Sequence, residues 1–457
     1  MSFHLHIGVL AFPFGTHAAP LLALVQRLAT ASAPAGEAGA RFSFFNSAVS
    51  NSSMSFSNSC ENIKAYDVWD GTPEGEVFGG THSDAVGLFL KASPRNFEKA
   101  IEEAEEDAGM KISCLISDAF LWFACDLAER RGVPWVPFWT AASCSLSAHF
   151  YTEEILTAFV GFKETAEQEQ TLTFIPGLSK VHFSDLPPEI FVEQNPSPLA
   201  ITINNMVGKL PKATAVVLNS FEEIDPIITK DLKSKFQDFL NVGPSILASP
   251  DTPPSPDHDK TGCLSWLETQ NKPKSVVYIS FGTVVIPSEK ELLALAETLE
   301  TRKLPFLWSL GGNAKKYLPE GFIERTSGFG KIVPWAPQAG VLAHNSVGVF
   351  VTHCGWNSVL ESVSRGVPLI CRPFFGDQKI NSRMVEVSWK IGVRVEGGVF
   401  TKASTMKALD RIMSGEAGKV IRENVRRLKD KAVSAVELKG SSSKNFEKLL
   451  EIISVPN

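Results

Sequence analysis

Short apolar runs alternate with longer amphipathic stretches in the first half of the chain. The apolar runs are LHIGVLAFP (5–13), KISCLISDAF (111–120) and VPWVPFW (133–139). The stretches HAAPLLALVQRLATA (17–31) and FACDLAERRG (123–132), which follow the first two runs, carry apolar residues at helical spacing. Strands that are apolar on both faces are typical of a parallel sheet covered by helices on each side. This half is therefore predicted to form a doubly wound α/β domain.

The second half repeats the same alternation. Its predicted strands are SVVYISFG (275–282), PFLWSL (305–310), GVFVTH (348–353) and PLICRPFF (368–375). Its predicted helices include EKELLALAETLETRK (289–303) and NSVLESVSRG (357–366). The pattern predicts a second doubly wound α/β domain.

A stretch rich in Pro, Ser and Asp, GPSILASPDTPPSPDHD (243–259), separates the two halves and is typical of a linker. The predicted organisation is an N-terminal domain over 1–242, a linker over 243–262 and a C-terminal domain over 263–435. The helical pattern breaks and resumes near the end of the chain, so residues 436–457 are predicted to form a helix that returns to the N-terminal domain.

Composition and charge exclude several classes of function. The 457 residues are long enough for two cores, and 44% hydrophobic with 21% charged residues describes an ordinary globular protein. The net charge of −6 supplies no basic field for nucleic acid or for an anionic membrane, so neither is a predicted partner. Any bound phosphate must be held by local geometry.

The sequence predicts a reduced, cytoplasmic protein. Seven cysteines spread through a long chain, with no CxxC pair, indicate free thiols instead of a disulfide framework or a zinc site. The apolar run near the N-terminus follows no Lys or Arg and precedes no small-residue cleavage site, which favours a buried strand over a signal peptide. No apolar run has the length of a membrane span.

Several motifs of nucleotide and hydrolase chemistry are missing. The sequence has no GxGxxG after the first strand, no GxxxxGK[ST] and no GxSxG. The absence of GxGxxG makes a nicotinamide-dependent oxidoreductase a remote alternative. Asp257-His258-Asp259 has the DxD pattern that can hold a divalent cation, but it lies in the Pro-rich linker, so no metal site is predicted.

The run THCGWNSVLE (352–361) places polar donors where a predicted strand meets a predicted helix. Ligands of open α/β sheets collect beyond the carboxyl ends of the strands, and helix N-termini attract anions. Gly355 permits a tight turn, and Asn357 or Ser358 is predicted to cap the helix, Ser358 in a capping box with Glu361. His353 and Trp356 are expected in an exposed loop.

A second strand end, SFGT (280–283), also carries a glycine and hydroxyl groups. Together the two donor clusters predict a diphosphate site. The alternative for NSVLE alone is a well-capped helix without a ligand.

The segment from Trp335 to Gln378 closely resembles the signature box of plant secondary-product UDP-glycosyltransferases. The resemblance extends over nearly the whole chain and is tightest to flavonoid 3-O-glucosyltransferases, through stretches such as LAFPFGTHAAPLL, ISDAFLWFACDLAE and HFSDLPPEI. It implies the GT-B fold, with two Rossmann-like doubly wound domains that face a cleft.

The resemblance also implies how each part of a UDP-sugar is held. Trp335 would stack on uracil, the Ala336 backbone would pair with its edge, and Gln338 and Glu361 would bind the ribose. The implied phosphate ligands are Thr283, His353, Asn357 and Ser358, and the implied sugar ligands are Thr140, Trp356, Asp377 and Gln378. A terminal Gln with Trp at position 356 usually accompanies glucose in this family, so UDP-glucose is the predicted donor.

His17 in FPFGTHAAP and Asp118 in LISDAF both follow apolar runs, so a parallel sheet would bring them to the same rim. Each residue alone is more often a structural histidine or a helix cap. The resemblance implies that His17 is the general base and Asp118 the carboxylate that orients it. A single displacement without a metal would then give a β-glucoside.

For the acceptor, the resemblance implies a planar flavonoid. Phe14, Phe120 and Phe375 adjoin implied site residues and are expected to line its pocket, and His149 matches a residue that contacts flavonoid hydroxyls. Gly15 stands where many relatives have Ser, which removes one acceptor contact, and the region around Ser83 (GGTHSDAVG) is variable in the family. The choice between flavonols and anthocyanidins stays open.

Two alternatives remain for the function. The enzyme could act on another phenolic acceptor or another flavonoid hydroxyl, or the chain could bind a UDP-sugar without catalysis. The predicted partners are small molecules only, UDP-glucose and the aglycone, and the predicted assembly is a monomer.

Overall fold

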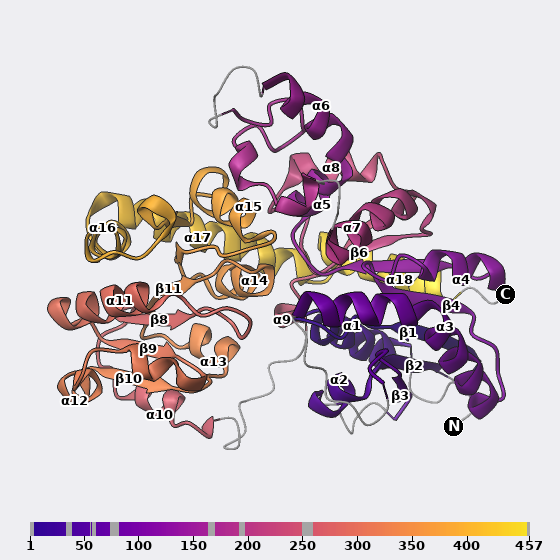
Figure 1. Ribbon diagram of the computed structural model, residues 1–457, viewed down its shortest axis with the longest axis horizontal. Coiled ribbons are helices and arrows are strands. Elements are labelled where there is room, and N and C mark those ends of the chain that lie inside the picture. Colours follow the sequence, from indigo (N-terminus) through magenta and orange to yellow (C-terminus); the bar gives the residue numbers. More distant parts are fainter. Residues whose placement is uncertain are drawn as a thin grey trace. The chain divides into compact units, whose positions relative to one another are not determined.

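The computed structural model describes residues 4–32, 39–54, 56, 61–73, 82–162, 170–191, 197–248 and 259–454. The chain divides into two compact units (Figure 1). Unit 1 comprises residues 1–165, 188–245 and 435–457, and unit 2 comprises residues 166–187 and 246–434. The segment 166–187, which the sequence places in the N-terminal domain, thus belongs to unit 2.

Among the described residues of unit 1, seven parallel strands form one sheet in the order β3-β2-β1-β4-β5-β6-β7. The strands are β1 (Leu5–Leu10), β2 (Ala40–Ser47), β3 (Ile63–Val68), β4 (Cys114–Asp118), β5 (Trp135–Trp139), β6 (Val216–Leu218) and β7 (Phe239–Asn241). The strands β1, β4 and β5 are buried along their whole length, as a sheet covered on both faces requires.

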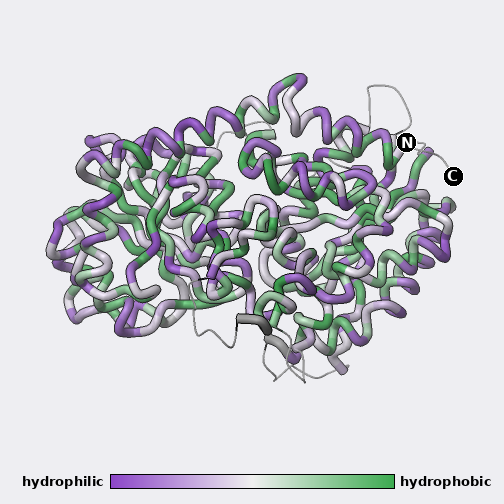
Figure 2. Tube along the Cα trace, turned by 90° about the horizontal axis from the view of Figure 1, so that it is seen from above, coloured by the Kyte–Doolittle hydropathy of each residue, from purple (hydrophilic) through white to green (hydrophobic). Residues whose placement is uncertain are grey.

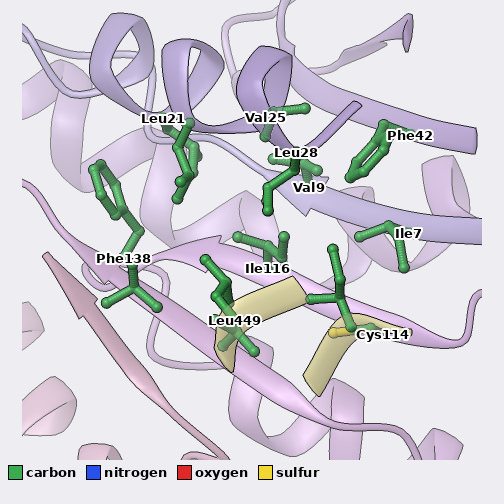
Figure 3. Packing of buried hydrophobic residues seen from close by; sticks show 14 of the residues in the cluster. Ile7, Val9, Leu21, Val25, Leu28, Phe42, Cys114, Ile116, Phe138 and Leu449 are labelled. Carbon is green, nitrogen blue, oxygen red and sulfur yellow. The ribbon is translucent and has the colours of Figure 1, made fainter. Parts of the chain in front are cut away.

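The helices of unit 1 include α1 (Ala18–Ala31), α2 (Ala48–Ser53), α3 (His82–Ala108), α4 (Ala124–Arg131), α5 (Ser143–Phe150), α6 (Thr152–Phe162), α7 (Pro198–Lys209), α8 (Pro226–Lys233) and α18 (Ser441–Ile453). The short helix α9 (Ser245–Ala248) lies at the boundary of the two units. Leu21, Val25 and Leu28 of α1 point toward the strands, and Leu449 of the C-terminal α18 belongs to the same buried cluster (Figure 3). This core rigidly supports the carboxyl end of β1, where α1 begins.

Unit 2 contains a second sheet, whose described strands are all parallel and run in the order β10-β9-β8-β11-β12-β13. Its strands are β8 (Val276–Ser280), β9 (Phe306–Ser309), β10 (Gly330–Val333), β11 (Val347–Thr352), β12 (Leu369–Cys371) and β13 (Gly392–Arg394). The chain enters each sheet at an inner strand, adds strands on one side and then on the other. That reversal of direction is where open α/β sheets bind ligands.

The α-helices in the described part of unit 2 are α10 (Cys263–Glu268), α11 (Glu289–Arg302), α12 (Phe322–Thr326), α13 (Gln338–Ala343), α14 (Trp356–Arg365), α15 (Gln378–Arg383), α16 (Lys402–Met413) and α17 (Gly415–Val436). Residues of α17 up to 434 belong to this unit. Leu292 and Leu295 of α11 pack with Leu409 of α16 in the core of the sheet. In Figure 2 the inner segments of the tube are mainly hydrophobic, whereas the outer coils alternate between hydrophobic and hydrophilic positions.

The segment 170–187 is attached to unit 2 by a buried carboxylate. Asp185 is 1% exposed and accepts hydrogen bonds from Arg383 Nε at 2.6 Å and from Arg394 Nη1 at 2.8 Å. Its Oδ2 also accepts from the backbone N–H of His182. These ion pairs join residues about 200 positions apart, and a local sequence pattern contains no information about such contacts.

No helix in the described part of the chain combines the length and the apolar character that crossing a membrane requires.

Candidate active site

His17, Asp118 and Thr140 come from the carboxyl ends of three neighbouring strands. The sheet order places β1, β4 and β5 side by side. His17 caps α1 after the turn that follows β1, Asp118 is the last residue of β4, and Thr140 follows the last residue of β5. Parallel strands end at one edge of the sheet, so the three side chains meet there.

The geometry defines the state of the His17 ring. Asp118 Oδ2 lies 2.8 Å from His17 Nδ1, and Thr140 Oγ1 lies 3.0 Å from the same nitrogen. Asp118 is 1% exposed, and its other oxygen accepts from the backbone N–H of Phe120 at 2.9 Å. A carboxylate can only accept, so Nδ1 carries the hydrogen and Nε2 keeps its lone pair. Because the His17 side chain is 20% exposed, that lone pair is a base within reach of a ligand.

Aromatic rings surround the imidazole. The ring centroid of His17 lies 4.7 Å from that of Phe120 and 5.1 Å from that of Phe12. Phe12 in turn contacts Phe14 at 5.2 Å and Phe120 at 5.4 Å. The structure thus places the predicted Phe120 beside His17, and the predicted Phe14 in the same cluster through its contact with Phe12. Phe12 was missed, although its place two residues before Phe14 after the first strand pointed to it.

His149 lies deeper in the same unit. Its ring meets Trp139 at 6.1 Å, and Trp139 meets Phe120 at 5.9 Å. His149 is buried, its Nδ1 has no hydrogen-bond partner among the described residues, and burial lowers its pKa to about 4. A buried ring nitrogen without a partner is unfavourable in the free protein and is available to a ligand hydroxyl.

The lowered pKa of His149 predicts acid sensitivity of unit 1. The unfolded chain takes up a proton near pH 6.5, and the folded chain only near pH 4, so stability falls as pH decreases between these values and then levels off. Between pH 7.5 and 5.0 we expect His149 alone to remove roughly 2 kcal/mol. The urea concentration at the midpoint of unfolding should therefore fall less in His149→Phe than in the wild type over that pH range. Equal losses in both proteins would contradict the prediction.

Gly15 lies in the turn before His17 with φ of +62°, a left-handed conformation that glycine adopts without cost. A serine in this conformation would be strained, so the glycine has a local structural reason besides the predicted loss of an acceptor contact. Residues 79–81 of the variable region GGTHSDAVG lie outside the described residues, as do the side chains of His82 and Ser83.

The predicted helix cap in unit 2 is wrong. Helix α14 begins at Trp356, and its N-cap is Gly355, which has no side chain to cap it. Asn357 and Ser358 therefore lie inside the first turn. The preceding Cys354 takes a left-handed backbone with φ of +65°, uncommon for a residue with a side chain. This turn starts the helix earlier than the Ser and Asn pattern suggests, and the glycine at the N-cap has no side chain that could bond to the first-turn amides.

His353 fits between two glycines. A Cβ on Gly355 would lie 2.6 Å from His353 Nε2, and a Cβ on Gly282 would lie 3.1 Å from its Cε1. Burial lowers the pKa of His353 to about 4, so the ring is neutral at pH 7 and has one N–H to donate. Its Nδ1 is enclosed and has no partner among the described residues. The two predicted donor clusters, 280–283 and 352–358, thus meet around this ring.

The expectation of an exposed Trp356 is wrong. Trp356 is 3% exposed because it is the first residue of α14 and its ring lies 6.3 Å from that of Trp389.

A hydrogen-bonded group joins the predicted ribose ligands. Gln338 Nε2 donates to Glu361 Oε2 at 2.7 Å and to Ser358 Oγ at 2.9 Å. Tyr278, buried in β8, donates to Gln338 Oε1 at 3.3 Å and so orients the amide. Burial raises the pKa of Glu361, and the bond from Gln338 opposes this shift. Tyr278 was not predicted, because a tyrosine within an apolar strand is typical of a hydrophobic core.

The residues predicted to hold uracil and phosphate differ in exposure. Trp335 is 57% exposed after β10, whereas Ala336 is buried. Thr283 is exposed in the loop after β8.

The sugar end of the predicted box is organised by its own backbone. Gln378 is buried, and its Oε1 accepts from the backbone N–H groups of Phe374 at 2.8 Å and Phe375 at 3.2 Å. Only its NH₂ group therefore remains for a ligand. Asn381, which was not predicted, donates to Asp377 Oδ2 at 2.9 Å and to the carbonyl of Cys354 at 3.1 Å. Phe375 is largely exposed in unit 2.

Within the described part of the chain, no three His, Cys, Asp or Glu side chains are grouped as a metal site requires. Asp257 and His258 of the DxD pattern lie outside the described residues. Asp259 accepts from the backbone N–H groups of Leu264 and Ser265 at the start of α10, so it acts as a helix cap.

Comparison with known proteins identifies the family. The family model of UDP-glucoronosyl and UDP-glucosyl transferase matches residues 251–436. An anthocyanidin 3-O-glucosyltransferase of Gentiana triflora is 56% identical over 97% of both chains. The chain belongs to this family of glycosyltransferases.

One further relative and one solved structure support this family assignment. A flavonol 3-O-glucosyltransferase of Actinidia chinensis var. chinensis is 54% identical over 98% of this chain and 97% of its own. A crystal structure of UDP-glucose: anthocyanidin 3-O-glucosyltransferase in complex with UDP has a TM-score of 0.91 at 41% identity, covering 99% of this chain and 100% of the other. The predicted GT-B fold of the transferase is confirmed.

Proposed function

We propose that this glycosyltransferase transfers glucose from UDP-glucose to the 3-hydroxyl of a flavonol or an anthocyanidin, with inversion at the anomeric carbon. The observation that carries the proposal is the His17–Asp118 pair at 2.8 Å, in a chain more than half identical to enzymes of these names. Apart from Phe375, the residues proposed to act on the acceptor belong to unit 1, and apart from Thr140, those proposed to hold the donor belong to unit 2.

In this mechanism His17 Nε2 takes the proton of the acceptor hydroxyl. The oxygen then attacks the anomeric carbon as the bond from that carbon to the UDP oxygen breaks. Asp118 holds the tautomer with hydrogen on Nδ1 and stabilises the imidazolium that forms. A single displacement gives a β-glucoside, UDP and protonated His17.

Unit 2 would stabilise the departing diphosphate without a metal. The first turn of α14 offers backbone N–H groups and the positive end of its dipole, and His353, Thr283, Asn357 and Ser358 add side-chain donors. The Nδ1 of His353, which has no partner among the described residues, supports a ligand at this place. Such donors carry out the charge stabilisation that a divalent cation performs elsewhere.

The remaining contacts would select the nucleoside and the sugar. Trp335 would stack on uracil above the Ala336 backbone, and the oxygens of Glu361 and Gln338 would accept from the ribose hydroxyls. Asp377, the NH₂ group of Gln378, Thr140 and the Trp356 region would hold glucose.

The acceptor would lie against the aromatic cluster of unit 1. Phe14 and Phe120 supply flat apolar surface beside His17, and the enclosed Nδ1 of His149 can take a hydroxyl of the polyphenol. Phe375 of unit 2 is a further proposed contact.

The decisive experiment offers quercetin and an anthocyanidin to the purified enzyme with UDP-glucose, UDP-galactose or UDP-glucuronate, with and without excess chelator. We expect UDP release and a 3-O-β-glucoside by NMR with UDP-glucose, undiminished by the chelator. Transfer to a different hydroxyl, or only to simpler phenolics, would replace the proposed acceptor. Binding of UDP-glucose without transfer to any aglycone would refute the catalytic proposal.

A further inference from the structure

Thr140 was predicted to contact the sugar, yet in the structure its hydroxyl oxygen faces the base. Thr140 Oγ1 lies 3.0 Å from His17 Nδ1, the nitrogen that Asp118 Oδ2 approaches to 2.8 Å. We propose that Thr140 is a positioning residue for His17, whose hydroxyl oxygen is the second acceptor of the Nδ1 hydrogen and keeps the ring in the tautomer with a free Nε2. The inference rests on the proposed function of His17 as a base.

The position of the hydrogens follows from the pair of distances. If Nδ1 were bare, its lone pair would face the Asp118 carboxylate at 2.8 Å, and both groups could only accept. Nδ1 therefore carries the hydrogen, and the Thr140 oxygen accepts part of it in a three-centre bond. The Thr140 hydroxyl can still donate its own hydrogen in another direction, so the same side chain can contact a sugar oxygen as well.

The second oxygen restricts how the ring can rotate. With Asp118 as the sole acceptor, the imidazole could turn about the Nδ1–Oδ2 line, and its Nε2 would sweep away from the acceptor hydroxyl. Thr140 approaches from a different strand, β5, whereas Asp118 ends β4, so two contacts of different direction hold Nδ1. Threonine suits this task because its branched Cβ confines χ1. The rings of Phe12 and Phe120 limit the remaining tilt.

The test uses Thr140→Val, which keeps the shape and removes the hydroxyl, and Thr140→Ser, which restores it. Each is assayed with UDP-glucose and with UDP-xylose, a donor that lacks the outer hydroxymethyl group of glucose. If Thr140 positions His17, Thr140→Val should lose roughly three- to tenfold in kcat with both donors, and Thr140→Ser should recover most of it. Thr157→Val, the same change at an exposed position of α6, is the matched control and should retain full activity.

A spectroscopic readout tests the same point without turnover. In ¹⁵N-histidine-labelled protein, with the His17 signals assigned from His17→Gln, the wild type should show a protonated Nδ1 and a bare Nε2. Thr140→Val should show a shifted Nδ1 signal or broadened His17 signals, because the ring then has more than one orientation, and Thr140→Ser should resemble the wild type.

Two results would overturn the inference. One is a loss in Thr140→Val that is confined to UDP-glucose and absent with UDP-xylose, which would make Thr140 a sugar contact only. The other is an unchanged His17 spectrum in Thr140→Val. Failure of the proposed function looks different, because His17→Ala would then keep its activity or the wild type would transfer no sugar, whereas the tautomer measurement would still report on Thr140.

Discussion

Replacing His17 by alanine is expected to lower kcat/KM for glucosyl transfer by roughly 10²- to 10⁴-fold, the usual contribution of a general base. The acceptor hydroxyl then loses the nitrogen proposed to take its proton, the Nε2 of a ring whose Nδ1 faces Asp118 at 2.8 Å. Binding of UDP should be nearly unchanged, because the residues proposed to hold UDP belong to unit 2 and His17 belongs to unit 1. Steady-state rates and UDP calorimetry measure the two effects separately.

Asp118→Asn tests whether Asp118 fixes the tautomer of His17. An amide keeps the size of the carboxylate, but its NH₂ group can donate to Nδ1 and thereby favour the tautomer with hydrogen on Nε2. We expect a loss of similar order with the fold intact by circular dichroism. Retention of activity within about threefold in His17→Ala would show that another group is the base.

Replacing Asp185 by alanine is expected to reduce the stability of unit 2 by roughly 2–4 kcal/mol. The carboxylate is 1% exposed, and the variant would leave Arg383 and Arg394 as partly buried cations without their partner. The two arginines keep some access to water, at 19% and 25% exposure, which places the expected loss below that of a fully buried pair. Asp185→Asn should lose less, because its amide oxygen can still accept a hydrogen bond.

The measurement must resolve unit 2 from unit 1, since two units need not unfold together. Urea-dependent hydrogen exchange of peptides from β13 and α15 provides this, because these elements carry the two arginines. Glu423→Ala is the matched control, since Glu423 also binds two arginines, Arg426 and Arg427, but on an exposed face of α17. The control should shift the midpoint little. A shift of the same size in Asp185→Ala and in Glu423→Ala would contradict the prediction.

The strands and the type of fold were readable from the sequence because their signals are local. The apolar runs at 5–13, 111–120 and 348–353 became β1, β4 and β11 with ends within about three residues. Continuous apolar runs separated by helices leave the parallel doubly wound sheet as the consistent arrangement. His17 and Asp118 could be paired from the sequence for the same reason, since each follows such a run and both neighbouring strands end at one edge.

Errors arose where a contact distant in sequence overrides a local pattern. Ser358 looked like a helix cap because of its neighbours, but its hydroxyl accepts from Gln338, and Gly355 caps the helix instead. Trp356 looked like part of a loop, but packing beside Trp389 buries it. In each case a residue about 20 to 33 positions away decides the outcome, and a short window contains no information about it.

The sequence by itself determined the two doubly wound sheets and the family box from Trp335 to Gln378, and it supplied the prediction of the base and the donor ligands. These features follow from the periodicity and spacing of residues that are close together in the sequence. Only the tertiary structure decided that Thr140 shares Nδ1 of His17 with Asp118 and that Asp185 attaches the segment 170–187 to unit 2. These contacts join residues 123 and 198 positions apart. They depend on which strands and helices become neighbours, and hydrophobic pattern alone does not specify that order.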